Sequence, residues 1–109
     1  MTDYILVQTT TNSLQEAEKI ASEITGLRLA ACTQIDGPIT SVYHWKGQVE
    51  KDSEWRCSFK TSRNLFKALE TKIKEIHTYE TPEIIAIPIL EASSEYAEWM
   101  KNELEKGNL

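Results

Sequence analysis

Residues 30–61 constrain the fold most strongly, because their side chains alternate in character with the period of two that is typical of a β-strand. On the first arm of this segment, one strand face carries Ile39, Ser41, Tyr43 and Trp45. On the second arm, Trp55, Cys57 and Phe59 alternate with Glu54, Arg56, Ser58 and Lys60. Lys46 and Gly47 separate the arms, and Gly47 accepts the positive φ of a tight turn. The pattern predicts a long, twisted β-hairpin.

Three other segments have the apolar spacing of helices. Ser13 and Glu16 form a capping box at the start of a helix expected over residues 13–28. A second helix is expected over residues 62–77. A final helix with an acidic, solvated face is expected to begin at Ser93 or Ser94.

Two short apolar segments predict the remaining strands. Residues 4–7 favour a strand buried on both faces, and residues 84–89 favour the last strand of the core. Pro88 removes a ladder donor, which argues that its strand lies at a sheet edge. Gly37 and Pro38 interrupt the first hairpin arm, so this arm is expected to be bent or at an edge.

The order of these elements predicts the fold class. Residues 1–109 form one domain with the order β-α-β-β-α-β and an extra C-terminal helix. Two right-handed crossovers around a hairpin give an α+β, ferredoxin-like sandwich with one antiparallel sheet. Two helices cover only one sheet face, and the other would expose an aromatic-rich patch that monomers avoid. We therefore expect self-association with closed cyclic symmetry.

The charge balance excludes some classes of partner. Seventeen acidic and twelve basic residues give a net charge of −5, which argues against nucleic acid and against an anionic membrane surface. No apolar run approaches the roughly 20 residues that span a bilayer. The N-terminus lacks the pattern of a signal peptide, so the expected compartment is the cytoplasm.

The two cysteines are expected to be reduced. If Trp45 faces Gln48, the hairpin register places Cys57 opposite Asp36, about four residues or roughly 13 Å from Cys32. A disulfide needs Cα atoms within about 7 Å. Free thiols are consistent with a reducing compartment.

A polar cluster directly before the last strand is the first candidate site. His77, Glu80 and Glu83 offer an imidazole and two carboxylates, the donor types that Zn²⁺ or Cu²⁺ accepts. Alternatively, His77 suits the end of a helix, where it stabilises the dipole, and the two glutamates suit a solvated loop. Tyr79 is either part of the cleft or a packed ring with its hydroxyl at the rim.

The hairpin supplies the second set of candidates. Tyr43, Trp45 and Trp55 are large rings suited to an interface, or alternatively to stacking on a ligand. Lys60 could bind a small anion or simply end a strand in solvent, and His44 is expected at the surface or an interface. No Gly-rich phosphate loop and no nucleophile paired with a base is found, so we expect no enzyme.

Several motifs resemble the CutA family in order and spacing across essentially the whole chain. They are Ala30-Ala-Cys32, Gly37-Pro38-Ile39, Ser41-Val-Tyr43-His-Trp45-Lys-Gly47, Lys60-Thr61, His77-Thr-Tyr79-Glu-Thr-Pro82-Glu83 and Tyr96-x-x-Trp99. The resemblance implies a stable homotrimer of ferredoxin-like subunits. The family is named for tolerance of divalent cations, copper above all.

The resemblance also implies where copper would bind. The family's proposed copper ligands, a cysteine and two adjacent histidines, fall on Thr9, Ile76 and His77, so only His77 is retained. Threonine replaces a soft thiolate poorly, and isoleucine is no ligand. We therefore expect at most weak binding of Cu²⁺ or another divalent cation at subunit clefts near His77.

Three functional hypotheses follow. The first is a trimeric divalent-cation tolerance or homeostasis protein. The second is a structural or signalling trimer, similar to PII-type regulators, that senses or anchors a partner without metal chemistry of its own. PII-type regulators bind nucleotide with a long loop, however, and here that connection is only Lys46-Gly47. The third is an enzyme acting on a small anion, for which no nucleophile and base can be named.

Overall fold

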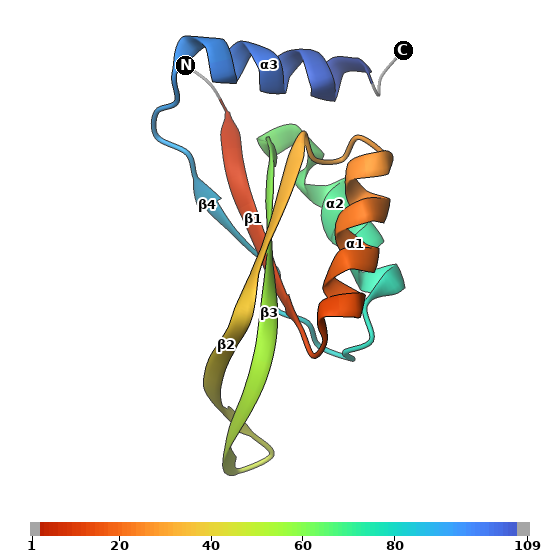
Figure 1. Ribbon diagram of the computed structural model, residues 1–109, viewed down its shortest axis with the longest axis vertical. Coiled ribbons are helices and arrows are strands. Elements are labelled where there is room, and N and C mark those ends of the chain that lie inside the picture. Colours follow the sequence, from red (N-terminus) through yellow and green to blue (C-terminus); the bar gives the residue numbers. More distant parts are fainter. Residues whose placement is uncertain (1–2, 107–109) are drawn as a thin grey trace.

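A four-stranded antiparallel sheet organises the chain, of which the computed structural model describes residues 3–106 (Figure 1). In chain order the elements are β1 (Tyr4–Thr11), α1 (Leu14–Gly26), β2 (Cys32–Trp45), β3 (Gln48–Ser62), the 3-10 turn η1 (Arg63–Leu65), α2 (Phe66–Ile76), β4 (Ile85–Pro88) and α3 (Ser94–Glu105). The strands lie in the order β2-β3-β1-β4, which places the two proline-containing strands at the edges. The predicted ferredoxin-like α+β fold and its C-terminal helix are confirmed.

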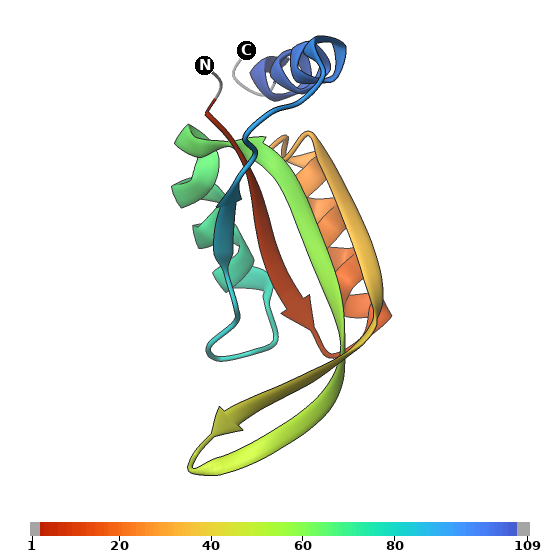
Figure 2. The same ribbon diagram turned by 90° about the vertical axis from the view of Figure 1, so that its left-hand side faces the viewer.

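The helices and the hairpin give the molecule its elongated shape, 44 Å in its longest dimension. Helices α1 and α2 cover one face of the sheet, and α3 lies across the end of the sheet farthest from the hairpin tip (Figures 1 and 2). The outer half of the β2–β3 hairpin extends beyond the helices. None of the helices within residues 3–106 has the length and apolar character needed to cross a membrane.

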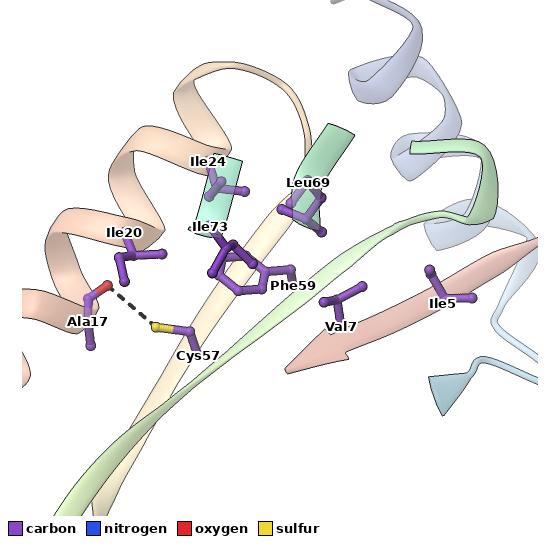
Figure 3. Packing of buried hydrophobic residues seen from close by; sticks show 10 residues of the cluster. Ile5, Val7, Ala17, Ile20, Ile24, Cys57, Phe59, Leu69 and Ile73 are labelled. Carbon is purple, nitrogen blue, oxygen red and sulfur yellow. Dashed lines mark hydrogen bonds between the residues drawn. The ribbon is translucent and has the colours of Figure 1, made fainter. Parts of the chain in front are cut away.

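The hydrophobic core fills the space between the sheet and the two helices (Figure 3). Its buried side chains include Ile5, Val7, Ala17, Ile20, Ile24, Cys57, Phe59, Leu69 and Ile73. These positions have a spacing of three to four in the helices and of two in the strands, as the amphipathic patterns predict. Phe59, from the central strand β3, is fully buried.

Strand β1 differs from its prediction, because only one face of residues 4–7 is buried. Ile5 and Val7 point into the core, whereas Tyr4 and Leu6 are half-buried. The expectation of burial on both faces is wrong for the single chain, because within residues 3–106 both α1 and α2 pack on the same side of the sheet. The opposite face also exposes Ile85 by 45% and Ile87 by 42%. A partly apolar sheet face is thus left open, as the sequence predicts.

Strand β2 contains an irregularity that changes the predicted hairpin register. Near the tip Trp45 pairs with Gln48 as expected, but Cys57 pairs with Ile35 and not with Asp36. The reason is that Gly37 and Pro38 together lie opposite the single residue Trp55. Such a two-against-one arrangement is a β-bulge. Beyond it, the odd-numbered side chains of β2 point to the opposite face of the sheet from those before it.

The helix ends are close to their expected positions. The Ser13 hydroxyl accepts a hydrogen bond from the Glu16 amide at 3.1 Å. The second half of the predicted capping box is not formed, since Glu16 Oε1 is buried without a partner among the described residues. Helix α1 ends two residues earlier than expected, before Arg28 turns the chain with a φ of 59°. Likewise, residues 63–65 form a 3-10 turn in place of the first turn of α2.

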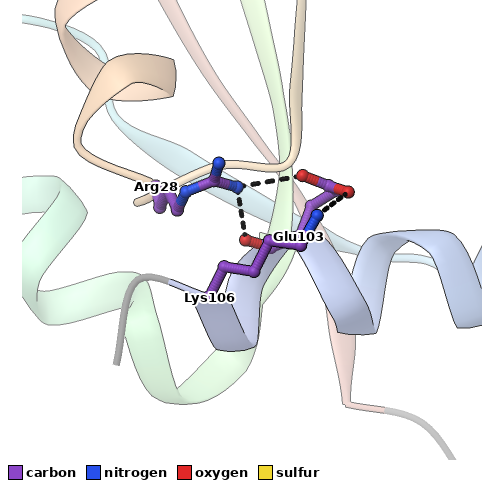
Figure 4. Close-up of polar contacts among 3 residues, drawn as sticks. All are labelled: Arg28, Glu103 and Lys106. Atoms are coloured by element: carbon purple, nitrogen blue, oxygen red, sulfur yellow. Dashed lines mark hydrogen bonds and ion pairs between the residues drawn. The ribbon is translucent and has the colours of Figure 1, made fainter. Parts of the chain in front are cut away.

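Arg28 connects the end of α1 to α3 (Figure 4). Its Nη1 atom donates to the Glu103 carboxylate at 2.9 Å and to the Glu103 carbonyl at 3.0 Å. Lys106 donates to the other oxygen of the same carboxylate at 3.0 Å. The hydrogen bonds from Lys106 and Arg28 lower the pKa of Glu103. These contacts, with buried Met100 and Leu104, hold α3 against the body of the chain.

The cysteines are both free, as predicted. In the corrected register Cys57 lies three residues along the hairpin from Cys32, because Cys32 pairs with Lys60. Burial raises the pKa of the Cys57 thiol to about 11, with a smaller contribution from Asp36. Its Sγ atom donates to the Ala17 carbonyl at 3.5 Å.

We expect Cys57 to resist alkylation in the folded protein at pH 8, because very little of a thiol with a pKa of about 11 is ionised there and iodoacetamide reacts with the thiolate. The measurement is mass spectrometry of a Cys32→Ser variant after treatment with iodoacetamide, with and without denaturant. Labelling of the folded and the denatured chain at the same rate would contradict the burial described here.

We expect Gly37→Ala to destabilise the protein by about 1–3 kcal/mol. A Cβ at this position would lie 2.7 Å from Trp55 Cδ1, and the residue has a φ of +156°. Gly26→Ala is the matched control, since a Cβ there would meet nothing within 4 Å. Denaturant unfolding of both variants tests the bulge, and equal midpoints for the two would argue against it.

Candidate functional site

A cleft of about 510 Å³ lies between the hairpin and the segment that joins α2 to β4. The hairpin contributes residues from β2 and β3, the α2–β4 segment contributes four residues, and β1 contributes one residue near its end. The lining residues are Thr10, Ser41, Val42, Tyr43, Trp45, Glu54, Tyr79, Glu80, Thr81 and Glu83. Three distant parts of the chain therefore meet at this cleft.

Glu54 is the most buried charged residue of the cleft, with only 7% of its surface exposed. Its Oε2 atom accepts a hydrogen bond from the Tyr79 hydroxyl at 2.6 Å. Burial and this bond raise the pKa of Tyr79, so the phenol keeps its proton and remains a donor. The bond joins the α2–β4 segment to β3.

Tyr43 makes a second bond between a phenol and a carboxylate on the hairpin. Its hydroxyl donates to Asp52, a diagonal neighbour on β3, since Tyr43 itself pairs with Glu50. This hydrogen bond raises the pKa of Tyr43 to about 12. Tyr43 is 39% exposed, and Trp45, two residues along the same strand, is 46% exposed. Both rings therefore present aromatic surface to the cleft while the tyrosine remains neutral.

His77 uses both ring nitrogens within the described chain. Its Nδ1 atom accepts from the Tyr79 amide at 3.0 Å, since an amide N–H can only donate. The proton must then be on Nε2, which donates to the Thr10 carbonyl at 2.8 Å. The ring also lies 4.8 Å from the Tyr79 ring. His77 thus fixes the start of the α2–β4 segment against β1.

These contacts do not fit a preformed transition-metal centre at His77. Neither ring nitrogen has a free lone pair directed at the cleft, and a metal would have to displace a hydrogen bond. Thr9 is fully buried, and its Oγ1 has no partner within residues 3–106. No group of three or more His, Cys, Asp or Glu side chains within the same residues is arranged to hold a metal ion.

The structure brings some of the sequence-predicted residues together and separates others. Five of them line the cleft, namely Tyr43, Trp45, Tyr79, Glu80 and Glu83. Lys60 lies elsewhere, with Nζ 3.3 Å from the Tyr96 hydroxyl, and Trp55 packs beside the core. His77 supports the cleft from outside its lining.

Glu54 was not predicted as a site residue. The strand alternation places it on the face opposite Trp55 and Cys57, but that pattern is the same for any solvated glutamate. Its burial depends on Tyr79 returning to the hairpin from 25 residues away. The sequence could have indicated Glu54 only if the hairpin segment that carries it had been matched in space with the segment that carries Tyr79.

Comparisons with known proteins cover most of the chain. The family model described as CutA1 divalent ion tolerance protein matches residues 5–103. A divalent-cation tolerance protein CutA of Thermus thermophilus is 38% identical over 101 residues, covering 93% of this chain and 96% of the relative. The chloroplastic protein CutA of Arabidopsis thaliana is 40% identical over 98 residues. That match covers 90% of this chain, but only 54% of the plant protein.

Solved structures agree with this assignment. The crystal structure of CutA from Xylella fastidiosa has a TM-score of 0.91 and 31% identity, with 94% of this chain and 99% of that chain covered. The Thermus thermophilus Cut A1 structure has a TM-score of 0.89 and 37% identity, with 92% and 97% covered. The chain belongs to the CutA1 family of divalent ion tolerance proteins.

Proposed function

We propose that this chain acts in divalent-cation tolerance as a homotrimer that binds divalent cations weakly at the cleft beside His77. The observation that carries the proposal is the charge of the cleft. Its lining contains Glu54, Glu80 and Glu83, and no lysine, arginine or histidine within residues 3–106. Glu80 and Glu83 are exposed at the rim, where a hydrated cation can reach them.

The chemistry of these donors determines what kind of binding is expected. Carboxylate and water oxygens suit hard cations, and two carboxylates on a flexible rim give low affinity. Copper prefers imidazole or thiolate, and His77 could contribute only by giving up its bond to Tyr79 or to Thr10. The same charge argues against a small anion in the cleft, since Lys60 lies outside it. The proposed role is therefore binding without catalysis.

The trimer is supported by what the single chain leaves uncovered. The open sheet face exposes Ile85 and Ile87, and the extended hairpin exposes Val42, Tyr43, Trp45 and Val49. Exposed apolar surface on this scale favours association between copies. The two free thiols favour a reducing compartment such as the cytoplasm for this chain.

We expect light scattering to give three times the 12.5 kDa mass of the chain at micromolar concentration. Trp45→Ala should weaken the assembly, because truncating an aromatic ring that is buried between copies costs on the order of 3–5 kcal/mol. His44→Ala, at an exposed neighbour on the other strand face, is the control. A stable monomer at this concentration would contradict the proposal.

We expect calorimetry with Mg²⁺, Zn²⁺ and Cu²⁺ to show weak binding, because the rim offers only two carboxylates as ligands. A Glu80→Gln/Glu83→Gln double variant should lose this binding, because neutral amides do not attract the cation. His77→Ala separates the alternatives, provided that circular dichroism shows it to be folded. If His77→Ala abolishes Cu²⁺ binding and the double variant does not, the imidazole and not the rim is the binding group.

A further inference from the structure

His77 holds the irregular segment between α2 and β4 with a neutral ring. Its Nδ1 atom accepts a hydrogen bond from the Tyr79 amide at 3.0 Å, and its Nε2–H donates to the Thr10 carbonyl at 2.8 Å. We call these two bonds the His77 latch. The Tyr79 hydroxyl in turn donates to Glu54 on β3 at 2.6 Å. The start of the segment is therefore tied to both β1 and β3.

Protonation of the ring is incompatible with one bond of the His77 latch. A neutral imidazole has one donor and one acceptor nitrogen, whereas an imidazolium has two donors. A proton from solvent would bind to Nδ1, and Nδ1–H would then be directed at the Tyr79 N–H, which lies 3.0 Å away. The bond from Nε2 to Thr10 can persist, but the Tyr79 amide loses its acceptor. The closed segment therefore favours the neutral ring, and its start must move when the ring is charged.

No carboxylate among residues 3–106 forms an ion pair with this ring, so a charged ring gains no partner in the closed arrangement. Strand β1, which supplies the Thr10 carbonyl, has Tyr4 as its only titratable side chain. The charged or titratable side chains on the other elements that adjoin the ring or its segment are Glu16 in the first turn of α1, Glu54 of β3, Lys74 and Glu75 in the last turn of α2, and Tyr79 and Glu80 of the segment itself. Carboxylates, lysines and tyrosines do not ordinarily change charge between about pH 5.5 and 8.

Histidine is the side chain that ordinarily changes charge in this range. The chain contains two histidines, His44 and His77. His44 is exposed near the tip of the hairpin, where it pairs with Val49. A pH-dependent change at the start of the α2–β4 segment can therefore be assigned to His77 by comparison with His44.

We propose that His77 makes one wall of the cleft sensitive to pH. At about pH 8 the neutral ring holds the α2–β4 segment against β1. As the pH falls through about 6.5, where imidazole side chains ordinarily ionise, the charged ring releases the Tyr79 amide. The wall that carries Glu80, Thr81 and Glu83 then becomes free to move. All of these contacts lie within one chain, so the His77 latch does not depend on which surfaces the assembly covers. The proposal goes beyond the divalent-cation role and does not rest on it.

The first test is nuclear magnetic resonance of the intact, ¹⁵N-labelled protein. At about pH 8 the ring nitrogens of His77 should show the Nε2–H tautomer. Protection of the Tyr79 amide against hydrogen exchange, relative to an unstructured peptide at the same pH, should fall about tenfold or more between about pH 8 and 5.5. The Leu27 amide, which donates to the Glu23 carbonyl at 3.0 Å, is the control and should stay protected. Constant protection of Tyr79 over this range would overturn the proposal, as would an Nδ1–H tautomer at pH 8.

The second test uses variants. His77→Asn retains a side-chain oxygen that can accept from the amide two residues on, but it does not ionise, so Tyr79 should stay protected down to about pH 5.5. His44→Asn is the matched control, since it removes the other histidine and should leave the pH-dependent loss of protection unchanged. The proposal is wrong if His77→Asn still shows that loss or if His44→Asn abolishes it. Should His77→Asn not fold, the unmodified protein decides, because the His77 ring and the Tyr79 amide must then change with the same midpoint.

Discussion

The two-against-one bulge at Gly37 and Pro38 determines which side of the hairpin faces the cleft. Beyond the bulge, Ile39 lies opposite Glu54, and the odd-numbered residues of β2 share a strand face with that glutamate. Without the extra residue, Val42 and His44 would occupy the positions that Tyr43 and Trp45 hold. The aromatic surface and the buried carboxylate are therefore on the same side because of one inserted residue.

The cleft also depends on how the α2–β4 segment is fixed. This segment has no regular structure between Ile76 and Ile85, so its position is set by side chains. His77 bonds to β1 through Thr10, and Tyr79 bonds to β3 through Glu54. A histidine that is fully used in this way contributes position rather than coordination. Both ring nitrogens of His77 are used in positioning the α2–β4 segment.

The sequence was sufficient for the element order, the edge strands and the open sheet face, because these follow from local periodicity and from prolines. It was not sufficient for the register near Cys57, because the pattern shows that Gly37 and Pro38 interrupt the strand but not that they oppose a single residue. It also could not identify Glu54, whose burial is created by a contact with distant Tyr79. Side chains whose roles depend on long-range contacts are the ones that periodicity leaves open.

Pro88 limits the addition of further strands at the free edge of the sheet. Ile89 donates its amide to the Tyr4 carbonyl at 3.1 Å, so the nitrogen of the preceding residue faces away from β1, toward the free edge of the sheet. At Pro88 that nitrogen carries no hydrogen, and β4 is only four residues long. A foreign strand would thus find an incomplete ladder at this edge. Pro88 therefore pairs inward with Ile5 but offers no N–H donor on its outer side, which makes β4 a poor template for the open-ended addition of strands.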